Sequence, residues 1–235
     1  MISIIIPAYN GAQFLDSALA SIEAQQLVGE VLLVDDGSHV ALKPPASVRY
    51  FRQSHQGPSA ARNRGIRESR NEFLAFHDID DLWTPGHLSR LHAALVAHPE
   101  AGIAQGWMRQ LSGDRISGPY RMPYISSCLF RREVFETCGL LDETMTLGED
   151  YDLMYRCWEN DIVKINVDEV SLIYRRHNGN TTRGNNERSH LLVMKRRIER
   201  IRSGLLDPNE KRRFEFREYI GNTEGAGEWT DWSAS

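Results

Sequence analysis

The chain has 235 residues, of which 41% are hydrophobic, and this is enough for one sizeable core with short additions. A formal net charge of −4 excludes the strongly basic surface of a general nucleic-acid-binding protein, so we expect no nucleic-acid partner. The three cysteines lack the spacing of a metal site and are expected to be reduced packing residues. No leader peptide and no run of about 18 apolar residues is recognisable, which favours a soluble, cytoplasmic protein.

The first eighty residues alternate between short apolar runs and helical periodicity. Four runs predict buried strands, namely residues 1–6, 30–34, 48–51 and 73–76. Apolar residues recur at helical spacing over residues 14–22, and another helix is expected to start near Ala60. This order implies right-handed crossovers and therefore an α/β fold with a largely parallel sheet flanked by helices.

Carboxylates gather where two of these strands end. The second strand runs into Asp35 and Asp36, and the fourth is followed by Asp78, Asp80 and Asp81. Because ligands bind at the carboxyl ends of strands in open α/β sheets, we expect these side chains to meet at one edge. Crowded carboxylates repel one another unless a cation neutralises them, which favours a hard divalent metal.

Simpler explanations exist for both acidic clusters. Asp36 followed by Gly37 can form an ordinary turn. Asp81 can cap the helix that follows, although Thr84 before Pro85 is a better helix start, with an N-cap and a proline at the first helical position.

A basic helix start and an acidic one follow later in the chain. Arg62 and Arg64 oppose the helix dipole, which is understandable if an anion binds there; pairing with carboxylates such as Glu68 is the alternative. Gly65 is expected to permit close packing of this helix on the sheet. The second helix starts after Gly148 with Glu149, Asp150 and Asp152, which can be there only because acids suit a helix N-terminus.

The last quarter of the chain changes character. Residues 162–167 predict a strand, and a Gly/Asn-rich loop at 174–181 carries two arginines and His177. Residues 191–205 show the periodicity of an amphipathic helix, and a second charged helix is expected from Asp207 and Pro208 toward Tyr219. These helices are expected to pack on the preceding domain or on a second copy, with a membrane surface as the alternative.

Five segments in this order resemble family 2 glycosyltransferases of the GT-A fold: residues 3–10, 34–38, 57–65, 78–81 and 148–152. Residues 125–132 and 139–143 are also similar to the acceptor-side segment of that family, although Leu141 stands where a Phe is more usual. The resemblance covers roughly residues 1–180. It implies metal-assisted, inverting transfer of a sugar from a nucleotide-diphosphate donor, with UDP as the expected nucleotide.

The resemblance also implies a donor site, made of Pro7, Ala8, Tyr9, Asp36, Arg62, Asp78 and Asp80. Asp36 would accept the uracil imide N–H. Asp80 would bind Mn2+ or Mg2+ directly, and Asp78 would contact the ribose or a metal-bound water. His177 would contact the metal or a phosphate, and we expect its loop to be mobile and to close over the diphosphate.

On the acceptor side, the family match places the general base on Asp150 and an acceptor contact on Glu149. The scheme is a single displacement that needs no covalent nucleophile. Missing membrane spans and a missing Gln-x-x-Arg-Trp motif favour non-processive transfer. One alternative is a non-catalytic nucleotide-sugar-binding relative. Another is a nucleotidyltransferase, which would want a glycine-rich basic loop that residues 7–11 do not provide.

These expectations divide the chain into three parts. Residues 1–185 form the GT-A catalytic domain, with a nucleotide-sugar-binding half at 1–105 and an acceptor half at 106–185. Residues 186–220 form a helical extension, and residues 221–235 a disordered tail. The expected acceptor is a saccharide or a lipid-linked molecule in polysaccharide or glycolipid biosynthesis, and the expected location is the cytoplasm or the inner face of the membrane.

Overall fold

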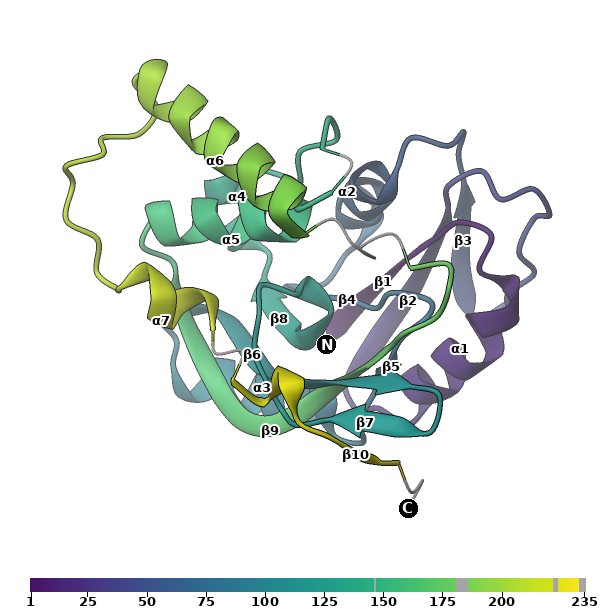
Figure 1. Ribbon diagram of the computed structural model, residues 1–235. Helices are drawn as coiled ribbons and strands as arrows, with labels where there is room; N and C mark the ends of the chain where they lie inside the picture. Colours follow the sequence, from purple (N-terminus) through teal and green to yellow (C-terminus); the bar gives the residue numbers. More distant parts are fainter. Residues whose placement is uncertain (146, 181–185, 222–223, 233–235) are drawn as a thin grey trace.

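The computed structural model describes residues 1–145, 147–180, 186–221 and 224–232, and a single mixed sheet runs through them (Figure 1). The strands are β1 (Ile2–Ala8), β2 (Val28–Asp35), β3 (Val48–Arg52), β4 (Phe73–Phe76), β5 (Leu82–Trp83), β6 (Ala101–Ser112), β7 (Arg115–Ser117), β8 (Cys128–Arg131), β9 (Val163–Arg175) and β10 (Trp229–Asp231). The helices are α1 (Leu15–Glu23), α2 (Pro58–Glu68), α3 (His87–Ala97), α4 (Glu133–Cys138), α5 (Glu149–Glu159), α6 (Asn186–Arg202) and α7 (Phe216–Ile220). Short 3-10 turns are η1 (Ala12–Phe14), η2 (Ile125–Ser127) and η3 (Glu224–Gly227).

The sheet order is β10-β7-β6-β8-β4-β1-β2-β3, with β9 beside β6 and β5. Strands β3, β2, β1 and β4 are mutually parallel, which confirms the α/β fold expected from the first eighty residues. Beyond β4 the pairing becomes mixed, because β8 is antiparallel to both β4 and β6 while β9 is parallel to β6. The parallel half brings the carboxyl ends of β1, β2 and β4 to one edge.

Two apolar layers cover the sheet, and β1 shows why its sequence is apolar throughout. Ile4 and Ile6 pack into the cluster formed with α1 and α3, whereas Ile5 points to the opposite cluster with α2, α4 and α5. Such a strand is buried on both faces, as parallel strands of α/β folds are. A Cβ atom on Gly65 would lie 2.3 Å from Cγ2 of Ile5, which confirms that this glycine permits close helix–sheet packing.

The start of α3 differs from the prediction. The helix begins at His87 after Gly86 in a left-handed conformation, so the expected N-cap at Thr84 is wrong. The Thr84 hydroxyl instead donates to the carbonyl of Val170, because this segment pairs with β9. Asp81 is not a helix cap either: its carboxylate accepts the backbone N–H of Arg175.

The C-terminal segments also differ in part. The expected helix after Asp207 is reduced to the short α7, and the strand predicted at 162–167 extends as β9 to Arg175. Within the expected disordered tail, β10 pairs antiparallel with β7, so Trp229 lies opposite Ser117. Residues 222–223 and 233–235 of that tail lie outside the described residues.

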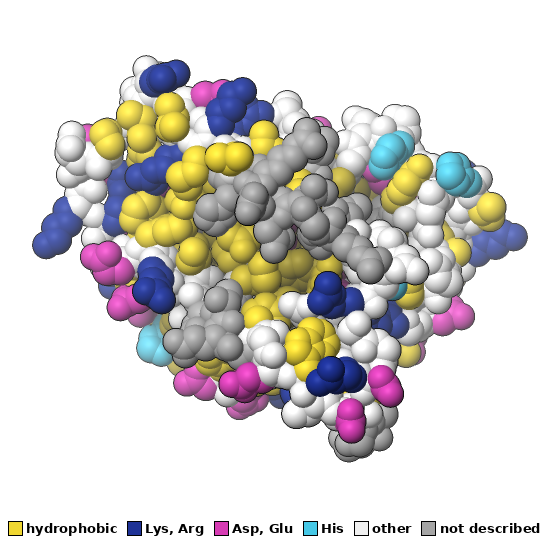
Figure 2. Space-filling view, in the orientation of Figure 1, with side chains coloured by type: hydrophobic (Ala, Val, Ile, Leu, Met, Phe, Trp, Pro, Cys, Tyr) yellow, Lys and Arg dark blue, Asp and Glu magenta, His cyan; other side chains and the backbone are white. Residues whose placement is uncertain are grey.

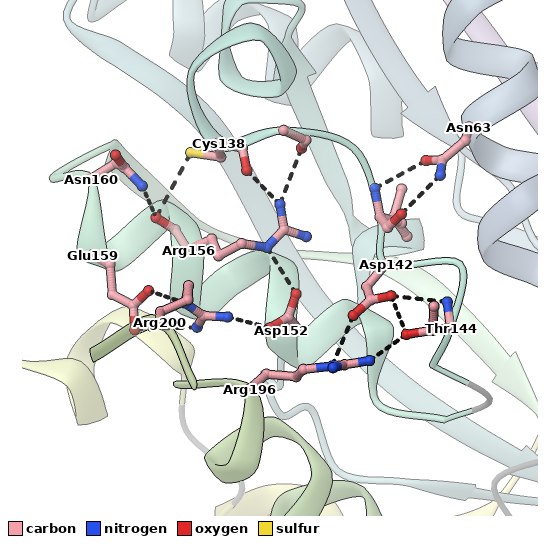
Figure 3. Close-up of polar contacts among 12 residues, drawn as sticks. Asn63, Cys138, Asp142, Thr144, Asp152, Arg156, Glu159, Asn160, Arg196 and Arg200 are labelled. Carbon is pink, nitrogen blue, oxygen red and sulfur yellow. Dashed lines mark hydrogen bonds and ion pairs between the residues drawn. The ribbon is translucent and has the colours of Figure 1, made fainter. Parts of the chain in front are cut away.

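Helix α6 is joined to α5 by buried ion pairs (Figure 3). Arg200 contacts Asp152 at 3.0 Å and Glu159 at 2.9 Å, and Arg197 contacts Glu159 at 2.8 Å. Val193 of α6 packs in a small apolar cluster with Tyr155 of α5. The helical extension therefore packs on the domain that carries the acidic helix start, as one of the sequence alternatives predicted.

All three cysteines are buried and form no disulfide, in keeping with a packing role. Within the described ranges, no helix is both long enough and apolar enough to cross a bilayer.

Candidate active site

The candidate site lies at the edge where β1, β2 and β4 end, and α2 and α5 begin beside it. It contains three groups of side chains: an arginine with three carboxylates, an aspartate–histidine pair, and two stacked aromatic rings beside a buried aspartate. Residues far apart in the sequence form each group.

Arg62 is the centre of the first group. Its Nη2 lies 2.8 Å from Oδ1 of Asp78, and its Nη1 lies 2.8 Å from Oε1 of Glu149 and 3.9 Å from Oδ1 of Asp150. The side chain is almost fully buried, and Glu68, the alternative partner, pairs with Arg49 instead. Arg62 therefore joins the end of β4 to the start of α5, and its guanidinium faces carboxylates.

The ionisation of Asp78 depends on this contact. Burial alone would raise its pKa, but the charge and the hydrogen bond of Arg62 outweigh that effect and hold the pKa of Asp78 below its usual value. The pKa of Arg62 is raised despite its burial, because Asp78, Asp150 and Glu149 all attract its charge. Asp78 is thus kept as a carboxylate.

Asp150 has the opposite character. It follows Gly148, which adopts a left-handed conformation before α5, and it is 8% exposed. Its Oδ2 accepts the backbone N–H of Ile125 at 3.3 Å, whereas its buried Oδ1 accepts no hydrogen bond from the described residues. Burial raises the pKa of Asp150 to about 8; Arg62 opposes this, and the charges of Glu149 and Asp78 add to it. A carboxylate with such a pKa and a vacant oxygen is suited to accept a proton.

The second group joins Asp80 to His177, 97 residues further along the chain. Nε2 of His177 lies 2.8 Å from Oδ2 of Asp80, and the Asn180 amide donates to the same oxygen at 3.3 Å. Phe14 packs against the histidine ring at a centroid distance of 4.8 Å. The structure thus brings Asp80 and His177 together, while Thr181, the last residue of the predicted loop, lies outside the described residues.

The residues present fit a divalent cation. Burial is the main cause that raises the pKa of Asp81 well above its usual value, and repulsion from the charges of Asp80 and Asp78 adds to it. A nearby cation would relieve this repulsion. In the described part of the chain, no three His, Cys, Asp or Glu side chains are placed to hold a metal by themselves. A cation at Asp80 and His177 would take its other ligands from donor phosphates and water, as Mg2+ commonly does.

The third group surrounds Asp36, which is 2% exposed at the end of β2. Its Oδ1 accepts the side chain of Gln53 at 2.9 Å and the backbone N–H of Gln56 at 3.0 Å. Its Oδ2 accepts the N–H of Gly57 at 2.7 Å and lies 2.9 Å from Nδ1 of His55, whose hydrogen bond goes to the main-chain carbonyl oxygen of Asp36 at 3.1 Å. The imidazole of His55 stacks on the half-exposed ring of Tyr9.

Pro7 and Ala8 lie in β1 with buried side chains, and the carbonyl of Ala8 accepts the N–H of Asp36. Both residues border the Asp36 group through their backbone. Sequence reasoning missed His55, Tyr124 and Asn180. Tyr124 donates its hydroxyl to Asp81 at 3.2 Å. No sequence pattern marks Tyr124. His55 lies two residues before the family-like segment 57–65, and Asn180 lies in the loop that carries His177, so both could have been found from their neighbours.

The mixed α/β sheet, with carboxylates at the ends of β2 and β4, defines a GT-A-like fold. The family model of "Glycosyl transferase family 2" matches residues 3–147, and the chain belongs to this family.

Relatives and solved structures agree with this assignment. The chain is 28% identical over 217 residues to the glycosyltransferase EpsJ of Bacillus subtilis, covering 77% of this chain and 63% of EpsJ. It is 29% identical over 195 residues to the succinoglycan biosynthesis protein ExoU of Rhizobium meliloti, covering 68% of this chain and 57% of ExoU. The chain thus spans less than two thirds of either relative.

Two structures with bound donors share the fold. S. aureus TarS 1–349 in complex with UDP-GlcNAc matches with a TM-score of 0.65 and 18% identity, over 78% of this chain and 60% of that one. The mannosyltransferase PcManGT of Pyrobaculum calidifontis, in complex with GDP-Man and Mn2+, matches with a TM-score of 0.65 and 17% identity, over 84% and 64%.

Proposed function

We propose that the chain is a non-processive, inverting glycosyltransferase that moves a sugar from a nucleotide-diphosphate donor, with UDP as the nucleotide, to an acceptor hydroxyl. The observation that carries the proposal is Asp150, a buried carboxylate with a vacant oxygen and a raised pKa. It lies beside Arg62 and Glu149, at the edge of the sheet where Asp36 and Tyr9 also lie. The names of ExoU and the donor complex of TarS support polysaccharide biosynthesis and a UDP-sugar.

In this mechanism Asp150 accepts the proton of the acceptor hydroxyl as that oxygen attacks the anomeric carbon. The bond between the anomeric carbon and the diphosphate oxygen breaks on the opposite face, so the configuration inverts and the nucleoside diphosphate leaves with the electron pair. Glu149 accepts a hydrogen bond from the acceptor and orients it, and Arg62 holds the carboxylate after β4 and those at the start of α5 in place. Asp150 then returns its proton to water.

Asp80 and His177 would hold a divalent cation, Mn2+ or Mg2+, which when bound neutralises charge on the departing diphosphate. Asp78, kept ionised by Arg62, would accept a hydrogen bond from the donor ribose or from a metal-bound water. Tyr9 and Asp36 receive the base.

Replacing Asp80 by Asn tests the cation site. We expect the wild-type chain to gain about 2.7 kcal/mol of unfolding free energy at a UDP-sugar concentration a hundredfold above Kd, only when Mn2+ is present. Asp80→Asn should lose the metal-dependent part, as measured by thermal unfolding with and without Mn2+. The control is Asp114→Asn, an exposed carboxylate in the β6–β7 turn. An unchanged response of Asp80→Asn to Mn2+ would refute the assignment, and donor binding without any transfer would favour the non-catalytic alternative.

The exposed face of α6 supports a lipid-linked acceptor at the inner face of the membrane. Leu191 and Ile198 on α6, and Leu205 just beyond its end, recur every seven residues and are 72%, 46% and 79% exposed. Lys195 and Arg202 lie between them, and Figure 2 shows apolar and basic side chains interleaved over this helix. An anionic lipid surface complements both kinds of side chain.

Sedimentation measures this contact with two kinds of vesicle. One is pure phosphatidylcholine, and the other contains about 30 mol% phosphatidylglycerol in addition. Lys195→Glu combined with Arg202→Glu should lower binding to the anionic vesicles by at least about tenfold. Val96→Ser, which removes an exposed apolar side chain from α3, should have no effect. Equal binding to both vesicle types, or a dimer in light scattering, would contradict a membrane contact.

A further inference from the structure

At the proposed base site, a side chain of the protein itself lies against Tyr9 and Asp36. The ring of His55 stacks on the ring of Tyr9 with a centroid distance of 4.0 Å and an interplanar angle of 23°. Aromatic rings at this spacing are in contact, and a base cannot enter between them without separating the two. One face of the Tyr9 ring is therefore covered by His55.

His55 also makes the polar contact that a base would need. Its Nδ1 lies 2.9 Å from Oδ2 of Asp36 and 3.1 Å from the carbonyl oxygen of Asp36. Both neighbours are acceptors, so Nδ1 must carry the proton and donate it. A flat ring that stacks on Tyr9, with a ring N–H 2.9 Å from the Asp36 carboxylate, occupies the position that a uracil would take there.

We propose that His55 is an internal surrogate for the nucleobase, which must leave Tyr9 and Asp36 before a donor nucleotide can bind. The inference rests on the proposed function, because it takes Tyr9 and Asp36 as the base site. It assigns to His55 a role in setting donor affinity.

The surrounding loop permits this exchange without unfolding. Three of the contacts to Asp36 come from Gln53, Gln56 and Gly57, and these anchor the loop after β3. Only the fourth comes from the His55 imidazole, whose side chain is 54% exposed and can turn into solvent about its own bonds. An imide N–H can then take over the position on Oδ2 while the loop stays anchored.

The consequence is a lowered affinity for every ligand that needs the base site. The apparent dissociation constant equals the intrinsic one divided by the fraction of molecules in which His55 has left. A stacked pair with one hydrogen bond makes this factor about three- to tenfold. A ligand that binds only at the cation and phosphate positions escapes the penalty.

Isothermal titration of the full chain with UDP and, separately, with inorganic pyrophosphate, both with Mn2+, tests the proposal. His55→Ala should bind UDP about three- to tenfold more tightly than the wild type and bind pyrophosphate equally well. His39→Ala is the matched control, because His39 approaches the same Tyr9 ring edge-on at 6.1 Å without touching Asp36. It should leave both affinities unchanged.

The outcomes separate this inference from the function on which it rests. If the wild type binds UDP and His55→Ala binds it equally or less tightly, His55 is no surrogate, although the donor site stands. If neither binds UDP, both proposals fail. Long-range 1H–15N spectra of the histidines supply a second readout: His55 should show the Nδ1–H tautomer in the free chain and lose that signature when UDP is added.

Discussion

Replacing Asp150 by Asn is expected to lower sugar transfer by about 10²–10⁴-fold, the usual contribution of a general base, while donor affinity stays unchanged. The amide is nearly the same size as the carboxylate and cannot accept the acceptor proton at a useful rate. Initial-rate kinetics with titration of the donor measure both quantities. Glu136→Gln, an exposed acid on the neighbouring α4, is the control. An Asp150→Asn chain that transfers sugar at the wild-type rate would contradict the base assignment.

The same substitution is expected to stabilise the fold at neutral pH. With a folded pKa of about 8, Asp150 holds a proton in the folded state that the unfolded chain releases near pH 4. The folded state therefore binds more protons between these values, and the free energy of unfolding falls as pH rises, by about 1.4 kcal/mol per pH unit from this group. Asn removes that cost. The stability gain over the wild type should grow from pH 4 to about pH 8 in urea titrations.

Activity should follow the opposite direction. Only ionised Asp150 accepts a proton, so kcat/KM of the wild type should rise with pH toward about 8 and then level off. Catalysis needs the ionised form of Asp150, but burying that charge lowers the stability of the fold. The site therefore gives up folding stability for catalysis.

Replacing Arg62 by Met is expected to reduce the free energy of unfolding by about 3–5 kcal/mol at pH 7, the usual effect of removing one partner of a buried ion pair. It leaves the largely buried carboxylates of Asp78 and Glu149 without their counter-charge. Urea unfolding monitored by circular dichroism measures the change. Arg67→Met is the matched control on the same helix, because its pair with Glu143 is exposed and 3.7 Å long, and a change within about 0.5 kcal/mol is expected.

The pH dependence identifies the cause. In the wild type, Arg62 keeps the pKa of Asp78 below its usual value, so this contribution is present above pH 4 and is lost as the carboxylate protonates. Without Arg62, burial raises the pKa values of the same carboxylates, and ionising them costs stability as pH rises. The deficit should therefore shrink toward pH 4, and Glu149→Gln should recover part of it. A deficit of equal size at every pH would mean that only the packed stem of Arg62 matters.

Much of the parallel half of the fold follows from short sequence patterns. The apolar runs of β1, β2 and β4 are local signals, because a strand buried on both faces is apolar along its whole length. The turn residues after each strand place Asp36, Asp78 and Asp80 at the carboxyl ends, and the parallel order brings those ends together. The fold class, the family and the general position of the site could therefore be predicted.

Elements that depend on distant partners could not. The start of α3 is displaced because Thr84 donates to Val170, 86 residues away, rather than to its own helix. β9 continues to Arg175 because β6 and β5 supply hydrogen bonds along its length. β10 forms only because β7 offers an open edge. The helix or strand propensity of each of these segments is weak, so the segment it packs against decides which structure it adopts.

The sequence by itself determined which chemical groups this protein carries and at which strand ends and helix starts they lie, because spacing and turn residues act over a few positions. Only the tertiary structure decided their partners: Arg62 with Asp78 and Glu149, Asp80 with His177, and His55 on Tyr9. The physical reason is that charge and ring contacts depend on distance and burial. Both are set by how segments 16 to 97 residues apart pack together.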